Sequence, residues 1–135
     1  MIVLDCGRQF DSSIVARAAR GRAEIIDRIK VQRAFICHET VKLLERTPAG
    51  NTPVIVLDFL STFYDENVKM GARKYLLERS LGHFQRLSQG AGLAVTIHAP
   101  SSHDDFYLYE RLRASASSVS EYEISRLPVE QMGLF

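Results

Sequence analysis

The sequence predicts a three-layer α/β domain built on a mostly parallel sheet of about five strands. Four short segments are rich in β-branched residues and apolar on both faces, which is typical of strands buried within a parallel sheet. They span residues 2–5, 28–34, 54–59 and 93–98. Helical segments lie between them, and this alternation favours right-handed crossover connections. Residues 119–124 alternate in polarity and are expected to form an edge strand.

Four helices are expected between the strands, over residues 11–21, 38–47, 67–89 and 103–114. Side-chain oxygens of residues 11–13 can cap the first helix, and Gly21 suits its end. The third helix carries a single apolar stripe at spacings of three and four residues. Asp104 and Asp105 lie in the first turn of the fourth helix and arginines lie in its last, as the helix dipole favours.

Composition narrows the class of protein. The chain has 135 residues, enough for about one domain, with 46% hydrophobic and 24% charged residues. Its net charge of +1, from 17 basic and 16 acidic residues, lacks the basic excess of a dedicated nucleic-acid binder. No apolar run reaches the roughly 18 residues of a membrane helix. Cys6 and Cys37 show no metal or disulfide spacing, so we expect a reduced, cytoplasmic protein that does not contact a membrane.

Polar residues follow three of the predicted strands. Asp5 ends the first strand, Asp58 lies near the end of the third, and Thr96 and His98 end the fourth. Because ligands of open α/β sheets bind beyond the carboxyl ends of the strands, these side chains are expected to gather there. Buried carboxylates at such positions must be liganded, hydrogen-bonded or open to water.

Four stretches together resemble the core of the RecA/RadA recombinases and KaiC-like ATPases. In order, they read MIVLDCGRQFDSSIVARAARG, DRIKVQRAF, VIVLDFLSTFYDE and GLAVTIHAP. The resemblance covers residues 1–124 and only the part of that core that follows its phosphate-binding strand. It implies a single truncated RecA-like (P-loop NTPase-like) domain over residues 1–135. Residues 126–135 are rich in apolar residues and are expected to form a C-terminal apolar tail.

The same resemblance assigns vestigial nucleotide and magnesium positions to Asp58, Ser61 and His98. Asp58 matches the acid that orients magnesium, and His98 stands where the family carries an amide that senses the γ-phosphate. Asp5 and Phe10 also fit the family pattern, but Gly7 occupies the position of the glutamate that activates water. A glycine cannot position or deprotonate water.

The phosphate-binding motif GxxxxGK[ST] does not occur in this sequence, which contains no Gly-Lys pair. That loop and its lysine surround the phosphates and supply most of the catalysis in P-loop enzymes. We therefore expect a degenerate domain that does not hydrolyse ATP and needs no cofactor. The alternative is an ATPase domain that binds ATP and Mg²⁺ through a loop supplied elsewhere.

A zinc site, a catalytic triad and an unrelated enzyme active site each lack part of the pattern that they require. A zinc site from His98, His103 and Asp104 or Asp105 lacks a recognised ligand spacing, and we expect no metal site. Ser101 and Ser102 precede His103, but adjacency in sequence does not make a catalytic triad. An unrelated enzyme that uses Asp5, Asp58 and His98 would require a closed pocket.

Nucleic-acid binding is a further hypothesis. In the recombinases, loops that correspond to residues 64–71 and 99–105 bind single-stranded DNA, but the second loop is short and acidic here, and acids repel phosphates. Cationic side chains gather near the long helix, where Arg79, His83 and Arg86 share a face. The candidate contacts are Lys69, Arg73, Arg79 and Arg86.

Interaction with another protein is the function we expect. A RecA-like core without its phosphate-loop strand has an open sheet edge, and such an edge must be covered or paired. Homo-oligomerisation or docking onto a RecA-like partner would cover it. The apolar tail at 126–135 is expected either to pack back on the sheet or to insert into a partner. The expected function is a non-catalytic assembly, regulatory or interaction subunit, with DNA recombination or repair as the setting. The alternative is a DNA-processing ATPase domain that depends on nucleotide.

Overall fold

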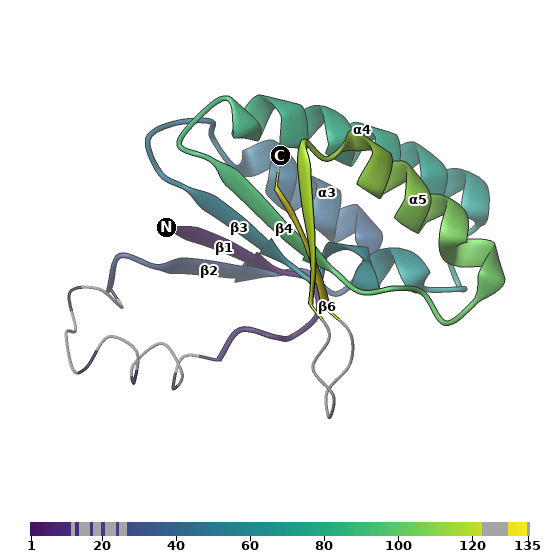
Figure 1. Cartoon of the computed structure of the whole chain (residues 1–135), viewed down its shortest axis with the longest axis horizontal. Helices are drawn as coiled ribbons and strands as arrows, with labels where there is room; N and C mark the ends of the chain where they lie inside the picture. The colour runs from purple at the N-terminus through teal and green to yellow at the C-terminus, as the bar shows by residue number, and fades with distance from the viewer. Residues whose placement is uncertain are drawn as a thin grey trace.

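A computed structural model describes residues 1–11, 13, 17, 20, 24, 27–122 and 130–134 of the chain. They form an α/β domain around a six-stranded sheet with the order β2-β1-β3-β4-β6-β5 (Figure 1). The strands β1 to β4 are parallel, whereas β6 is antiparallel to both of its neighbours. The sheet is therefore mostly parallel, as predicted.

The strand boundaries agree with the sequence pattern to within a few residues. The parallel strands are β1 (Ile2–Asp5), β2 (Lys30–Arg33), β3 (Val54–Leu57) and β4 (Leu93–Ile97). The third strand ends earlier than predicted because Asp58 adopts a left-handed conformation, with φ 51°. A 3-10 helix, η1 (Phe59–Tyr64), begins directly after it.

The described helices are α3 (Cys37–Arg46), α4 (Met70–Ser88) and α5 (Phe106–Ser115), with the 3-10 turn η2 (His103–Asp105) before α5. They correspond to the second, third and fourth predicted helices. The helix expected over residues 11–21 falls largely outside the described residues. None of the described helices combines the length and apolar character that a membrane crossing requires.

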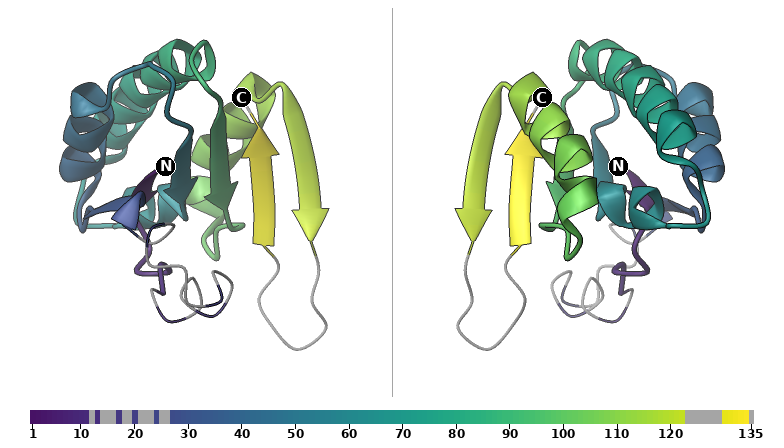
Figure 2. Two further views of the ribbon diagram at one scale, coloured as in Figure 1. Left: turned by 90° about the vertical axis from the view of Figure 1, so that its left-hand side faces the viewer. Right: turned by 90° about the vertical axis from the view of Figure 1, so that its right-hand side faces the viewer.

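The core lies between the sheet and the helices α3, α4 and α5, which share one face of the sheet (Figures 1 and 2). Buried side chains of β1, β3 and β4 pack against the buried faces of these helices. Within this core the ring of Phe59 packs against the rings of Phe63 and Phe84, with centroids 4.9 and 4.8 Å away. These helices supply one layer of the predicted three-layer arrangement, and the second helical layer stays a prediction.

The C-terminal half of the sheet contains one more strand than predicted. The expected edge strand is β5 (Ser118–Tyr122), and it does lie at the end of the strand order. The additional strand is β6 (Glu130–Leu134), which comes from the predicted apolar tail and pairs with both β4 and β5. The position next to β4 is therefore filled by the chain itself.

Candidate functional site

The carboxyl ends of β1, β3 and β4 bring Asp5, Asp58 and His98 to one edge of the sheet. Asp5 is the last residue of β1, Asp58 follows β3 directly and His98 follows β4. This convergence is expected, because parallel strands end at the same edge. The two carboxylates have different partners, however, and each is engaged within the protein.

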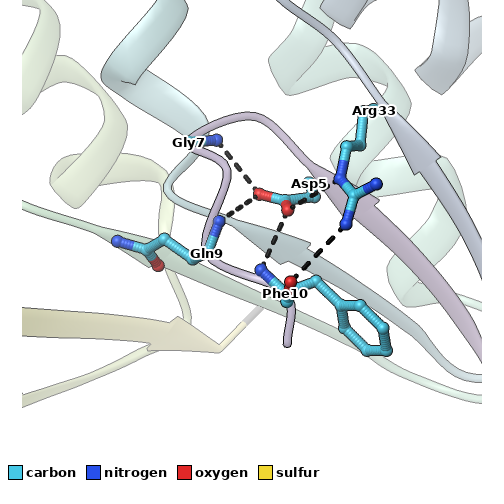
Figure 3. Close-up of polar contacts among 5 residues, drawn as sticks. All are labelled: Asp5, Gly7, Gln9, Phe10 and Arg33. Atoms are coloured by element: carbon cyan, nitrogen blue, oxygen red, sulfur yellow. Dashed lines mark hydrogen bonds and ion pairs between the residues drawn. The ribbon is translucent and has the colours of Figure 1, made fainter. Parts of the chain in front are cut away.

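The carboxylate of Asp5 accepts hydrogen bonds from the loop that follows it (Figure 3). The amides of Gly7, Gln9 and Phe10 donate at 3.2, 2.9 and 2.9 Å, and Arg33 Nε lies 3.5 Å away. These four donors match the roughly four acceptor positions of an ionised carboxylate. Burial raises the pKa of Asp5, but the backbone amides and Arg33 outweigh burial, so the net pKa is lowered. Asp5 is thus a structural acceptor that shapes the loop.

Asp58 is held by contacts with β4 and the residue after it. Its φ of 51° lies in the left-handed region, which aspartate tolerates better than most residues. Its amide donates to Thr96 Oγ1 at 2.7 Å. Its Oδ1 lies 2.5 Å from His98 Nδ1, a short contact between a nearly buried carboxylate and an imidazole that is 40% exposed.

Gly7 lies directly against the side chain of Asp58. A Cβ atom built on Gly7 would stand 2.2 Å from Asp58 Oδ2 and 2.5 Å from Asp58 Cβ. Separations this short do not occur between unbonded atoms, so no larger residue fits without movement of Asp58. By the resemblance, Gly7 stands where the family has a glutamate. The packing shows what this glycine permits, which is the close approach of the loop after β1 to the end of β3.

His98 is oriented by two contacts in addition to the ion pair. Tyr64 Oη donates to the His98 carbonyl oxygen at 2.8 Å, and the two rings meet edge to face with centroids 5.3 Å apart. The hydrogen bond that His98 Nδ1 donates to the Asp58 carboxylate raises the pKa of His98, and partial burial opposes this rise. Burial raises the pKa of the Tyr64 hydroxyl, so Tyr64 acts as a neutral donor.

An imidazole oriented by a carboxylate is the arrangement of a general base. A nucleophilic mechanism also requires a hydroxyl or thiol bonded to the other ring nitrogen. Among the described residues, no serine, threonine or cysteine side chain is hydrogen-bonded to His98. The Asp58–His98 pair therefore forms a polar link between the ends of β3 and β4.

Ser61 lies apart from this pair. Its amide donates to the Asp58 carbonyl oxygen at 3.1 Å, but the residue lines a separate cavity of about 150 Å³ at the ends of β1 and β2. The lining residues are Cys6, Gly7, Arg8, Ala34, Phe35, Ser61 and Thr62. The three predicted nucleotide positions thus divide into Asp58 with His98 on one side and Ser61 on the other.

The inner wall of this cavity is neutral. Burial raises the pKa of the Cys6 thiol to about 12, so Cys6 stays protonated and unreactive at neutral pH. Thr40 Oγ1 and Thr62 Oγ1 lie 2.9 Å apart, and the Thr40 hydroxyl contacts Cys6 Sγ at 3.8 Å. This buried hydroxyl pair joins α3 to η1 behind the cavity.

The basic residues predicted to contact nucleic acid occupy different environments. Arg73 is buried, and its Nη1 donates to Asp105 Oδ1 at 2.9 Å and to the Phe63 carbonyl oxygen at 3.2 Å. In this position its guanidinium is part of the interior and cannot reach a ligand at the surface. Lys69 is exposed at the N-cap of α4.

The predicted basic face of α4 lies against α3. Arg79 forms an ion pair with Glu45. Arg86 donates to the carbonyl oxygens of Leu44 and Thr47 at 2.9 and 2.8 Å and so caps the end of α3. Because these guanidinium groups already have partners on α3, they stabilise the helix pair in this conformation.

The segment at 99–105 supplies an interior contact through its last residue, since Asp105 is buried against Arg73. That contact directs the Asp105 carboxylate into the interior, away from the zinc site considered above with His98 and His103. Within the described part of the chain, no three His, Cys, Asp or Glu side chains are grouped to hold a metal ion.

Sequence reasoning missed Tyr64 and the packing role of Gly7. No local signal identifies Tyr64, because its partner His98 lies on another strand. For Gly7, the signal was available: a glycine two residues after a strand-end aspartate is consistent with close backbone approach.

No protein-family model matches this sequence, and no curated protein is similar enough to it to indicate a relative.

Proposed function

We propose that this chain is a non-catalytic RecA-like domain that acts as an assembly, regulatory or interaction subunit. The observation that carries this proposal is the engagement of both strand-end carboxylates within the protein. Asp5 receives three backbone amides and Arg33, and Asp58 pairs with His98. A nucleotide-hydrolysing site instead requires acids that face the metal and the attacking water.

The strand order adds support. β6 pairs with β4 along residues 94–97. A further parallel strand carrying a phosphate loop could join β4 only by displacing β6. The edges at the two ends of the order are β2 and β5, and an edge strand is a template for pairing with another chain. We propose homo-oligomerisation or docking on a RecA-like partner through such an edge.

The setting proposed for this subunit is DNA recombination or repair, which rests on the resemblance alone. The second candidate is a nucleotide-dependent DNA-processing ATPase domain whose phosphate loop comes from elsewhere. The observation that favours it is the position of Asp58 directly after a buried central strand. Binding of ATP and Mg²⁺ there would require His98 to release the carboxylate.

The test is light scattering coupled to size exclusion, with and without Mg-ATP, and fluorescent-ATP binding on the same sample. A dimer or larger species that is indifferent to nucleotide, with no detectable ATP binding, is the expected result. Micromolar, magnesium-dependent ATP binding that Asp58→Asn abolishes would overturn the proposal in favour of the ATPase domain. A strictly monomeric protein would contradict homo-oligomerisation and leave docking on a different chain.

A further inference from the structure

We propose that the cavity at the ends of β1 and β2 binds an acidic side chain from an extended segment of a partner protein, with an apolar neighbour of that acid on Phe35 and Ile36. This inference deepens the interaction function proposed above and rests on it. The cavity is lined by Arg8, Phe35 and Ser61, among other residues. Neither Asp58 nor His98 is among the described residues that line it.

The exposed apolar surface here is local and continuous in sequence. Phe35 is 55% exposed and Ile36 is 44% exposed, although both are large hydrophobic residues. Scattered single apolar residues are normal at a surface, whereas contiguous exposed apolar patches mark interaction sites. Phe35 lines the cavity, and Ile36 follows it directly in the chain.

Charge determines the chemistry of the occupant. The guanidinium of Arg8 stacks over the Phe35 ring, 5.1 Å from its centroid. Among the described residues, Arg8 pairs with no carboxylate. A guanidinium stacked on an aromatic ring keeps its donors available for a carboxylate in bidentate geometry.

The acidic residues near the cavity already have hydrogen-bond or ion-pair partners within the protein. Asp5 is saturated by the loop amides and Arg33, and Asp58 pairs with His98. Glu39 Oε1 accepts from the amides of Phe35 and Ile36 at 3.1 and 3.2 Å. Arg8 is the charged side chain among the described residues that line the cavity, and no described carboxylate pairs with it, so the complementary ligand group is an anion.

The backbone at Arg8 is held in place by the loop that follows β1. Asp5 holds the amides on both sides of Arg8, from Gly7 and Gln9. Arg8 itself has φ 55°, in the left-handed region. The backbone at Arg8 is thus fixed before a ligand binds, which reduces the ordering cost of binding.

Size and composition favour a peptide carboxylate over a nucleotide or nucleic acid. A volume of about 150 Å³ is below the roughly 300–1,000 Å³ of pockets that enclose drug-sized ligands, and it suits a single side chain. Binding of a phosphate backbone relies on several cations, whereas one unpaired arginine lines this cavity. The exposed side chains of Phe35, in the cavity lining, and of Ile36, next to it in the chain, match an apolar residue beside the acid.

The experiment follows backbone-amide NMR shifts of the full chain on addition of three blocked peptides. One alternates leucine and glutamate, the second carries lysine in place of glutamate, and the third carries alanine in place of leucine. The expected result is saturable shifts at Gly7, Arg8, Phe35, Ser61 and Thr62 with the first peptide alone, weakened by salt. Arg8→Ala should reduce affinity about tenfold or more, the size of a lost charge-assisted hydrogen bond.

Control variants separate binding from folding. Arg46→Ala removes an exposed arginine at the opposite end of α3 and should leave peptide affinity unchanged. Arg8→Gly suits the positive φ and should match Arg8→Ala, and Arg8→Lys should retain part of the affinity. Thermal unfolding of each variant checks that the domain is intact.

Several results would overturn the inference: no shifts at millimolar peptide, shifts centred elsewhere, or equal binding of the lysine peptide or a single-stranded oligothymidylate. If Arg8→Ala converts an oligomer to a monomer, the occupant is a second copy of this chain and the partner-segment inference fails. Failure here with a nucleotide-indifferent oligomer leaves the proposed assembly function standing. Magnesium-dependent ATP binding would remove that function whatever the peptides do.

Discussion

Gly7 and Asp58 are packed so closely that a single methyl group between them would overlap the Asp58 carboxylate, with a Cβ at 2.2 Å from Oδ2. The contact joins the loop after β1 to the end of β3, two segments about fifty residues apart in the chain. It also explains why a side chain at position 7 and the Asp58–His98 pair are incompatible in this conformation. The following predictions begin from this contact.

Gly7→Ala should lower the free energy of unfolding by about 1–3 kcal/mol, because it overpacks a tight contact. Gly7→Ala combined with Asp58→Gly should recover much of this loss, since glycine removes the clashing side chain and suits φ 51°. Urea unfolding measures both. Gly71→Ala, where an added Cβ meets nothing within 4 Å, is the control and should be neutral or stabilising. Equal effects at positions 7 and 71 would contradict the contact.

The Asp58–His98 pair should make stability depend on pH. Because the pKa of His98 is raised in the folded protein, its contribution is fully present below the ordinary value of 6.5. It is lost as pH rises through the raised pKa. The contribution should be a few tenths to about 1 kcal/mol, since the imidazole is partly exposed. Asp58→Asn keeps the left-handed backbone and should flatten this dependence.

An NMR titration of the histidine ring protons checks the same pair directly. His98 should titrate above the ordinary histidine value. His83 provides an internal contrast, because burial and Arg86 lower its pKa. A His98 that titrates with or below His83 would contradict the 2.5 Å contact.

Arg73→Ala should destabilise the protein by about 3–5 kcal/mol, since it leaves the buried Asp105 carboxylate unpaired. The matched control is Arg79→Ala, which breaks the exposed pair with Glu45 and should cost about 0–1 kcal/mol. Arg73 Nε is buried without a hydrogen-bond partner among the described residues. Joint replacement by Met and Leu at positions 73 and 105 should therefore cost less than either single change to alanine. Similar values for Arg73→Ala and Arg79→Ala would place Arg73 at the surface.

Asp5→Ala should cost about 1.5–3 kcal/mol, the range for hydrogen bonds to a charged group. The lowered pKa of Asp5 gives stability that is present above its ordinary value of 3.8 and is lost as pH falls through the lowered value. The variant should therefore lose less stability on acidification than the parent. Glu66→Gln, at an exposed acid, is the control and should keep the acid dependence of the parent.

Val31→Pro should reduce the mass measured by light scattering if assembly uses the β2 edge. The amides of Lys30 and Ala34 donate to β1, so those of Val31 and Arg33 point away from it. Proline at position 31 removes only an outward donor. Val31→Thr keeps the amide and should leave the mass unchanged. An oligomer that survives Val31→Pro would use another surface, such as the β5 edge.

The strands β1 to β4 and the helices α3 to α5 could be predicted because apolar periodicity is a local property. The meeting of Asp5, Asp58 and His98 was also predictable, since parallel strands end at one edge. What each group does there could not be predicted. Asp58 is a partner of His98 because β4 lies beside β3, and Arg73 is buried because Asp105 packs against it.

Two further features depend on contacts between distant segments. The residues at 130–134 show no strand signal strong enough to distinguish a tail from β6, which forms because β4 and β5 present pairing edges on either side of it. Nothing in the sequence distinguishes Arg8 from the other arginines. Its position over Phe35 depends on the loop held by Asp5 and on the end of β2. The sequence alone determined where most of the helices and strands lie, because their signals are local. The tertiary structure determined which side chains are hydrogen-bond or ion-pair partners, because such contacts depend on which atoms meet in space.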